Sequence, residues 1–467
     1  MPTAPAITSI DHRRTAAAPS ARPAATPSLG ELAGAAKADR NRAVDLYRVV
    51  AMAAVAVGHW IAMAISVNPD GSLNGGNALS EDASLSWISW ILQVMPLFFV
   101  VGGFSSAMSL DAHMKAGNAG RPQDWIYARL RRMVTPTAVL ASTWLVVIAG
   151  GYLAGAGAIV AAGATAAALP LWFLSNYTID TAIAPSVLPA FRRRPGLVVG
   201  GGIAAYLVLE TLRFVDVPGL HHLNHVNWVL GWLLFQVAGF AWRDGMLPTG
   251  GRMLTIAGGF WATAIAAVTI GPYPTSMVHF DGIVNSPTHP PSLALMLFGA
   301  AYSATAIAAA PAISRFLAGN ARVWSAVVGA NAVAMSVYLW HMTAAVAASA
   351  VLYAFGLLPT AAIGSAAWWW QKLPIIALAI VFLAGIVSVV ARIEQKALLA
   401  PRTGWNGSLA TMIVVAAALS AAIKLWASGS VTTVIAGTVI TSVLAFGPTR
   451  LSSARFGERQ STASRGV

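Results

Sequence analysis

Twelve apolar runs, each about as long as a helix needs to cross the hydrocarbon core of a bilayer, most constrain how this chain can fold. No segment alternates in the way a membrane barrel strand does. The sequence therefore predicts an all-α integral membrane protein, a polytopic helix bundle. The segment 153–168, made of small apolar residues, is compatible with a short extra helix, a re-entrant segment or part of a neighbouring helix. The runs lie at residues 44–66, 87–110, 134–152, 170–190, 197–214, 226–242, 253–271, 292–312, 326–353, 374–392, 408–427 and 431–447.

The charge pattern agrees with a membrane protein. Only 10% of the residues are charged, against about a quarter in soluble domains. The net charge of +13 would suggest nucleic-acid binding in a soluble chain, but here the basic residues stand in short gaps between apolar runs. With the N-terminus inside, 26 of the 29 Lys and Arg residues fall on the cytoplasmic side. We therefore expect both termini to be cytoplasmic and expect no nucleic-acid partner.

The first apolar run carries polar residues at helical spacing. Asp45 precedes Arg48 by three residues, so the two side chains can pair on one helix face. His59 follows Arg48 by eleven residues, close to three turns, which places it on the same stripe roughly 16 Å further along the axis. Ionisable groups inside a membrane are costly and mark functional sites. The alternative is that Arg48 only anchors the topology and His59 is a satisfied core histidine.

A second intramembrane histidine, His341, lies in the ninth run within Tyr338-Leu-Trp-His341. Counted from the cytoplasmic ends of their helices, His59 and His341 reach similar depths, which would let them meet across a central cavity. A neutral imidazole accepts a proton from a hydroxyl near pH 7, so the pair indicates proton chemistry. Proton-coupled transport would use the same groups.

Two arginines before the third run, Arg129 and Arg132, stand at i and i+3 in a segment expected to be a loop near the cytoplasmic face. Such a pair can hold two phosphate groups of one ligand. The other interpretation is a cluster that only fixes topology. The triplet 192–194 has similar charge and no further motif around it, and it is interpreted as a topology signal alone.

The sequence favours the absence of a metal site. The chain has no cysteine, which excludes a disulfide framework, a thiolate nucleophile and a cysteine-ligated metal. The segment His221-His222-Leu-Asn-His225 has ligand-like spacing, but only Asp216 is an acidic neighbour, and we expect no metal.

Several of these motifs occur together and in order, and in combination they resemble the type 3 acyltransferase family of bacterial membrane proteins. Glu394 also resembles a short acidic motif of that family, and the likeness runs from about 43 to 396. In the second apolar run the chain has Gly102-Gly103 where many members have a Ser-Gly pair. The motifs are Asp45-x-x-Arg48, Arg48-(x10)-His59, the Phe98-Phe99/Gly102-Gly103 segment, Arg129-x-x-Arg132, Leu171-Trp-Phe-Leu174 and Tyr338-Leu-Trp-His341.

The resemblance implies a ten-helix core that transfers an acyl group, often acetyl, from cytoplasmic acyl-CoA to a hydroxyl of an envelope sugar, glycolipid or secondary metabolite. It implies that Arg129 and Arg132 bind the phosphates of the donor with Arg48 nearby, and that His59 is catalytic. Our own hypothesis adds that His341 helps His59 to remove the proton and that Asp45 and Arg48 belong to the catalytic residues. The expected location is the inner (plasma) membrane, with lipid, acyl-CoA and the acceptor as partners.

The chain is expected to divide into a disordered cytoplasmic tail (1–42), a ten-helix acyltransferase domain (43–396), an additional transmembrane hairpin (397–447) and a second disordered cytoplasmic tail (448–467). The hairpin and the first tail suit membership of an envelope-synthesis complex. Two other functions fit the same residues: a transporter or flippase for an acylated lipid or sugar, which needs no CoA, and a scaffold, in which the histidines and arginines would be functionally silent.

Overall fold

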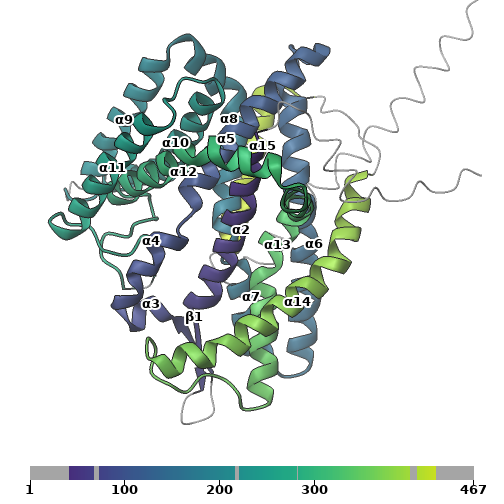
Figure 1. Ribbon diagram of the computed structural model, residues 1–467. Helices are drawn as coiled ribbons and strands as arrows, with labels where there is room; N and C mark the ends of the chain where they lie inside the picture. Colours follow the sequence, from purple (N-terminus) through teal and green to yellow (C-terminus); the bar gives the residue numbers. More distant parts are fainter. Residues whose placement is uncertain (1–40, 68–72, 216–219, 281, 400–406, 428–467) are drawn as a thin grey trace, which may run out of the picture.

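The computed structural model describes residues 41–67, 73–215, 220–280, 282–399 and 407–427, and helices dominate them (Figure 1). The helices are α2 (Arg42–Ala62), α3 (Ala78–Glu81), α4 (Ser89–Leu92), α5 (Met95–His113), α6 (Pro122–Leu153), α7 (Gly157–Ala168), α8 (Leu171–Arg193), α9 (Pro195–Thr211), α10 (Asn227–Arg243), α11 (Gly251–Thr269), α12 (Leu293–Gly319), α13 (Ala321–Ala354), α14 (Ala366–Leu399) and α15 (Leu409–Ala427). Short 3-10 helices η1 (Ala83–Ile88) and η3 (His221–Val226), a π-helical turn η2 (Met114–Asn118) and strands β1 (Met63–Val67) and β2 (Leu73–Asn77) complete the described part.

Eight helical stretches among the described residues are long and apolar enough to cross a membrane, and the shorter helices Pro195–Thr211 and Leu409–Ile423 are also apolar. In hydrocarbon each backbone N–H and C=O must be bonded within the chain, and a helix does this within a single segment. The prediction of an all-α polytopic membrane bundle is confirmed.

Most of the uncertain segment 153–168 forms a helix of its own, α7 (Gly157–Ala168), whereas Leu153 ends α6. Only Leu169 and Pro170 separate α7 from α8, and the two together make one candidate span, Gly157–Arg193. In Figure 1, α7 lies in the lower half of the bundle and α8 in the upper half. The segment is therefore one half of a broken span, and the break at Pro170 lies at the level of Tyr338, whose hydroxyl donates to the Pro170 carbonyl.

The placement of Arg129 and Arg132 in a loop is wrong. Helix α6 begins at Pro122 and carries both residues. Proline fits the first turn of a helix because its missing N–H would have no partner there. A hydropathy window detects contact with lipid rather than helical conformation, so it misses a polar turn made of good helix formers such as arginine.

Two further apolar runs are shorter as helices than expected. The first run ends as a helix at Ala62, where β1 begins and pairs antiparallel with β2 from Met63↔Asn77 to Val67↔Leu73. The second run is interrupted at Gln93 and Val94, directly before α5 with Pro96 in its first turn. Neither break changes the order of the spans.

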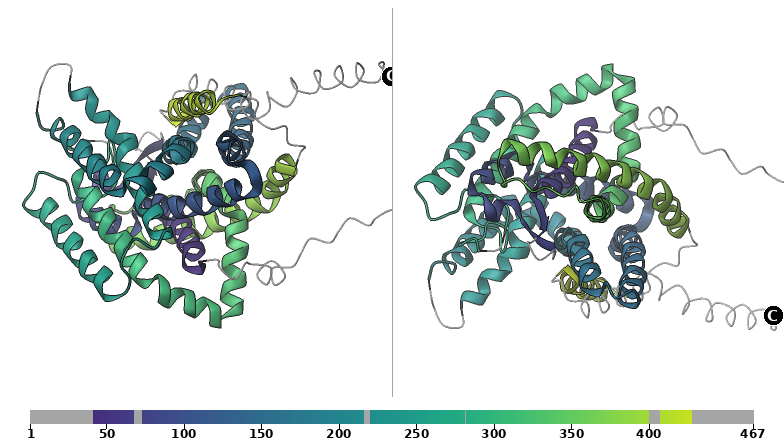
Figure 2. Two further views of the ribbon diagram at one scale, coloured as in Figure 1. Left: turned by 90° about the horizontal axis from the view of Figure 1, so that it is seen from above. Right: turned by 90° about the horizontal axis from the view of Figure 1, so that it is seen from below.

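Glycine lets α5 and α10 pack backbone to backbone. A Cβ placed on Gly103 would lie 2.8 Å from the carbonyl carbon of Gln236, and one on Gly239 would lie 2.7 Å from the amide nitrogen of Phe104. Small residues at such a contact let membrane helices approach closely. Seen along the bundle, α9, α10 and α11 form a group on one side, whereas the yellow α15 lies beside the blue helices on the other (Figure 2).

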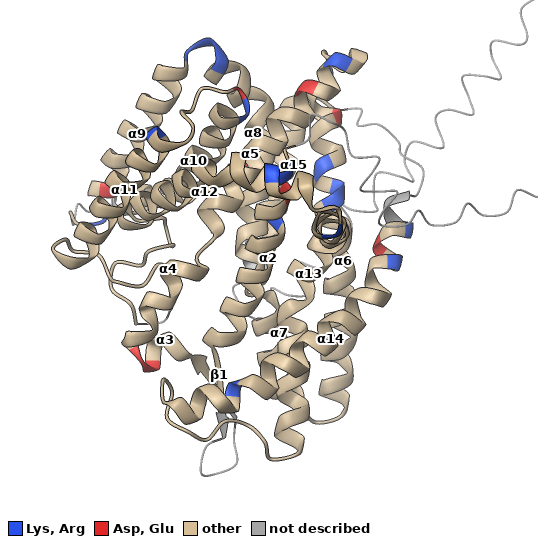
Figure 3. Cartoon of the chain, in the orientation of Figure 1, with Lys and Arg blue, Asp and Glu red and all other residues tan. Residues whose placement is uncertain are grey.

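Charged residues gather at one end of the bundle, the upper end in Figure 3. Arg192 forms ion pairs of 2.7 Å with both Asp111 and Asp244, and Arg243 pairs with Asp111 at 3.0 Å. The hydrogen bonds that Arg192 donates lower the pKa of Asp244 from its ordinary value. Arg192 therefore ties the ends of α5, α8 and α10 together, which is more than the topology signal expected for it.

The expected C-terminal hairpin is described in part. Its first helix is α15, which packs on α8, where the Ser175 hydroxyl lies 2.7 Å from the Ser420 hydroxyl. Its second helix, 431–447, and both expected tails fall outside the described residues, apart from residues 41 and 42. The division into domains stays a prediction.

Candidate functional site

The two intramembrane histidines meet between α2 and α13. The Nδ1 atom of His59 lies 2.9 Å from Nε2 of His341, and the planes of the two rings are nearly parallel, with an interplanar angle of 11°. His341 is fully buried, whereas His59 is partly exposed. The similar depths expected from the sequence thus correspond to direct contact. We call His59 and His341 the histidine pair.

Main-chain carbonyls hold His341 in place. Its Nδ1 atom lies 2.6 Å from the carbonyl oxygen of Tyr338, one turn earlier in α13. The indole N–H of Trp60, the residue after His59, donates to the carbonyl of His341 at 2.9 Å. The two helices are therefore joined at this level by one contact between side chains and one from a side chain to the main chain.

Arg48 is held by groups from three helices. It pairs with Asp45 at 3.6 Å, as the i, i+3 spacing predicts. It also donates to Asn331 Oδ1 of α13 at 3.3 Å and to the Ser105 hydroxyl of α5 at 2.8 Å. Asn331 in turn donates to the main-chain carbonyl of Asp45, so this end of α2 is fixed against α13.

Arg129 and Arg132 differ in their surroundings. The guanidinium of Arg129 donates to the Ser105 carbonyl at 3.0 Å and to the Ser109 hydroxyl, and it lies over the Trp125 ring. Arg132 is exposed and has neither a hydrogen bond nor an ion pair to the described residues.

Arg129 interacts electrostatically with Arg48, Arg132 and Tyr177, so these side chains lie near one another. We call Arg48, Arg129 and Arg132 the arginine cluster. Among the described residues, Asp45 is the one acidic residue that forms an ion pair with this cluster. The cluster therefore has an excess of positive charge, which favours an anionic ligand.

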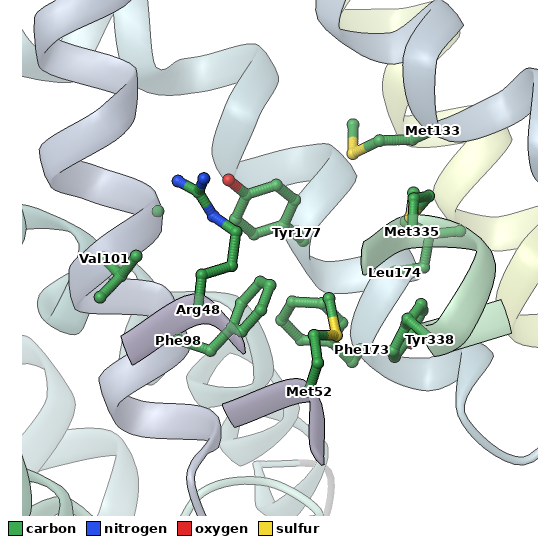
Figure 4. A pocket seen from close by; sticks show the side chains of 11 residues that line it. Arg48, Met52, Phe98, Val101, Met133, Phe173, Leu174, Tyr177, Met335 and Tyr338 are labelled. Carbon is green, nitrogen blue, oxygen red and sulfur yellow. The ribbon is translucent and has the colours of Figure 1, made fainter. Parts of the chain in front are cut away.

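A cavity of about 90 Å³ lies beside Arg48 of the arginine cluster and reaches Tyr338, one turn before His341 (Figure 4). In Figure 4 the Arg48 side chain reaches toward the Tyr177 hydroxyl, and apolar side chains form the rest of the wall. This volume is smaller than the roughly 300–1,000 Å³ of sites that enclose a whole drug-sized ligand, so the cavity has room for a narrow part of a ligand only. The lining residues are Arg48, Met52, Phe98, Val101, Gly102, Met133, Phe173, Leu174, Tyr177, Met335 and Tyr338.

The motifs did not point to Ser105, Asn331 or Tyr177, although each touches the cluster or the cavity. Serine and asparagine in apolar helices are a weak signal, because they equally bond the helix backbone. Asn331 is 283 residues from Arg48 in the sequence, and no local pattern predicts a contact between residues so far apart. Tyr177 lies six residues after Leu171, the first residue of a motif already singled out, and this proximity was the one available clue.

The other polar features remain apart from this site. Glu394 is buried and accepts a hydrogen bond of 2.5 Å from the Ser336 hydroxyl, which links α14 to α13. His222 and His225 lie in η3 with ring centroids 6.2 Å apart. Within the described ranges no three His, Cys, Asp or Glu residues are arranged to hold a metal ion.

The family model of the type 3 acyltransferases, described as an acyltransferase domain, matches residues 41–393. No curated protein and no solved structure matched the chain. The matched stretch contains the histidine pair, the arginine cluster and every residue that lines the cavity. Because the match covers most of the sequence, the chain belongs to the type 3 acyltransferase family and is a membrane acyltransferase.

Proposed function

We propose that this protein is an O-acyltransferase that moves an acyl group, acetyl in the simplest case, from cytoplasmic acyl-CoA to a hydroxyl of an envelope glycan, glycolipid or secondary metabolite. One observation carries the proposal. A single cavity has Arg48 of the arginine cluster at one side and, at the other, Tyr338, whose carbonyl bonds His341 of the histidine pair. The cavity thus extends from an anion site to the helical turn that precedes His341, and its lining between Arg48 and Tyr338 is mostly apolar.

Each part of this arrangement suits one part of the donor. The phosphates of CoA bind at Arg129 and Arg132, because guanidinium groups form strong bidentate hydrogen bonds to phosphate. Arg48 lies between the phosphates and the cavity, and the pantetheine arm passes among its methionine and aromatic side chains. Methionine adapts its shape readily, which suits a passage for a flexible chain. The thioester then lies near His59.

The reaction needs one proton acceptor and no redox partner. His59 removes the proton from the acceptor hydroxyl as its oxygen attacks the thioester carbonyl carbon. The new C–O ester bond forms, the C–S bond breaks, and the CoA thiolate leaves and takes up the proton from His59. The acceptor enters from the side of the bundle opposite the arginine cluster, with the protein in the inner membrane and its termini cytoplasmic.

The test uses the purified protein reconstituted into vesicles that also contain the extracted native acceptor, and it measures transfer of label from radiolabelled acetyl-CoA and release of free CoA in the same reaction. Because the chain has no cysteine, a thiol reagent reports CoA without background from the protein. We expect label in the lipid or glycan fraction and CoA release in equal amounts. Movement of an acylated lipid across vesicles without any binding of CoA would favour a flippase instead.

Replacing Arg132 by alanine should raise the KM for acetyl-CoA by about tenfold and leave kcat within about twofold, because a hydrogen-bonded charge contributes to binding without touching the reacting carbonyl. Arg193→Ala is the matched control, since Arg193 is also an exposed arginine at the charged end of the bundle. Its KM should equal that of the wild type. Equal KM values for both variants would remove Arg132 from the donor site.

A further inference from the structure

We propose that His341 is a positioning residue that fixes the tautomer of His59, so that Nε2 of His59 is the atom that accepts the proton. This inference rests on the proposed function for its chemical meaning, but the tautomers themselves are a property of the resting protein. It assigns different tasks to two histidines that look equivalent in the sequence.

The argument begins at the Tyr338 carbonyl. A carbonyl oxygen only accepts hydrogen bonds, and it lies 2.6 Å from Nδ1 of His341. Nδ1 of His341 must therefore carry a hydrogen. In a neutral imidazole the other nitrogen is then the acceptor, so Nε2 of His341 presents a lone pair.

That lone pair faces His59. Nδ1 of His59 lies 2.9 Å from Nε2 of His341, and two lone pairs at that distance would repel. Nδ1 of His59 must therefore donate, which leaves Nε2 of His59 without a hydrogen and able to accept a proton. No described residue bonds to Nε2 of His59, and the His59 side chain is partly exposed, so this nitrogen is left for a substrate.

The opposite assignment requires a doubly protonated His341 that donates from both nitrogens. This cation would be fully buried, and the groups that bond to its ring are the main-chain carbonyls of Tyr338 and Val337 and the ring of His59. None of them is a carboxylate. Burying a charge without a counter-charge costs far more than burying a neutral imidazole, so the neutral pair is the resting state.

The surrounding contacts prevent a reversal of the direction of the hydrogen bond between His59 and His341. The Trp60 indole donates to the His341 main-chain carbonyl. Because Trp60 follows His59 directly, this bond fixes the axial position of α13 relative to α2 beside the histidine pair. His341 stays fully buried, so water does not reach it to offer an alternative partner. In a serine hydrolase the orienting carboxylate holds a histidine tautomer in the same way, and losing that group costs up to about 10⁴ in rate.

The kinetic test compares His341→Leu with His341→Gln. Leucine fills the space without a hydrogen bond, whereas the glutamine amide oxygen can accept the hydrogen of His59 Nδ1. We expect kcat to fall by about tenfold or more in His341→Leu with the KM for acetyl-CoA within about twofold, and to be at least about fivefold higher in His341→Gln. His225→Leu is the control, because His225 Nδ1 also lies near a carbonyl three residues earlier, that of His222, at 3.1 Å.

A purely structural His341 would give equal losses in the leucine and glutamine variants, and an unchanged leucine variant would show that His341 has no role. Either result overturns the inference. If His59→Asn is inactive in the same assay, the proposed function stands regardless.

The second measurement needs no turnover. In protein with ¹⁵N-labelled histidine, the nitrogen signals that disappear in His59→Asn belong to His59, one of nine histidines. They should show the Nδ1–H form in the wild type and a mixture of both forms in His341→Leu. An Nε2–H form of His59 in the wild type would refute the inference even if the protein proved inactive.

Discussion

Replacing His59 by alanine is expected to lower the rate of acyl transfer by about 10²- to 10⁴-fold, while the affinity for CoA stays within about twofold of the wild type. The reason is that the variant loses the one imidazole nitrogen of the pair that is open to a substrate, since the nitrogens of His341 are occupied by Tyr338 and His59. The measurement is label transfer from acetyl-CoA in vesicles, combined with equilibrium binding of CoA to the purified protein.

His59→Asn separates loss of the base from loss of packing. The asparagine amide N–H₂ can replace the Nδ1–H donor toward His341, but no atom replaces Nε2. We expect this variant to melt within a few degrees of the wild type and to be as inactive as the alanine variant. Transfer at the wild-type rate by His59→Asn would show that His59 is not the proton acceptor and that the chemistry lies elsewhere in the bundle.

The positions of the two histidines could be predicted from sequence because helices translate spacing into geometry. Eleven residues place His59 on the stripe of Arg48, and the Asp45–Arg48 contact of 3.6 Å agrees with the i, i+3 rule. Depth in the membrane is counted in residues from a charged helix end, and that count suffices to place His59 and His341 at one level. Hydropathy located the spans for the same reason, since a bilayer demands a nearly constant length of apolar chain.

The rest of the site depends on contacts that no local pattern encodes. Ser105 reaches Arg48 across 57 residues of sequence, and Asn331 reaches it across 283. A short polar side chain in a helix gives the same signal whether it bonds its own backbone or a distant arginine. The sequence also could not predict which ring nitrogens of His59 and His341 contact each other. That choice depends on the orientation of the His341 ring, which its hydrogen bond to the Tyr338 carbonyl sets.

The strands β1 and β2 and the start of α6 show a second limit. The sequence 63–67 is as apolar as the helix before it, and it becomes a strand because residues 73–77 are available as a partner. Helix α6 extends into polar sequence, which brings Arg129 within hydrogen-bonding distance of Ser105. In both cases contacts with residues distant in the sequence decide the conformation. A hydropathy window reports only whether a segment prefers lipid or water.

Replacing Gly103 by alanine is expected to destabilise the protein by about 3 kcal/mol or more and to abolish activity with it. The added Cβ would lie 2.8 Å from the carbonyl carbon of Gln236 and 3.0 Å from its Cα. Backbone atoms of a packed helix cannot move aside as a flexible side chain can, so α5 and α10 must separate. Helix α5 also carries Ser105, which holds both Arg48 and Arg129. The measurement is the apparent Tm of the purified protein in detergent, followed by residual CoA release after heating.

Two other glycines serve as controls for Gly103→Ala, because an added methyl group has different neighbours at each of them. A methyl group added at Gly258 of α11 would have no heavy atom of a neighbouring residue within 4 Å, so Gly258→Ala should hold or slightly raise the Tm, as alanine is the better helix former. For Gly102→Ala the three nearest heavy atoms all belong to the Tyr177 side chain, with Cε2 at 2.7 Å, and a ring on the wall of a cavity can turn away. We therefore expect the loss of Tm to be largest for Gly103, smaller for Gly102 and absent for Gly258. Equal Tm values for Gly103→Ala and Gly258→Ala would mean that α5 and α10 do not depend on backbone contact, and the anchoring of the arginine cluster through Ser105 would need another explanation.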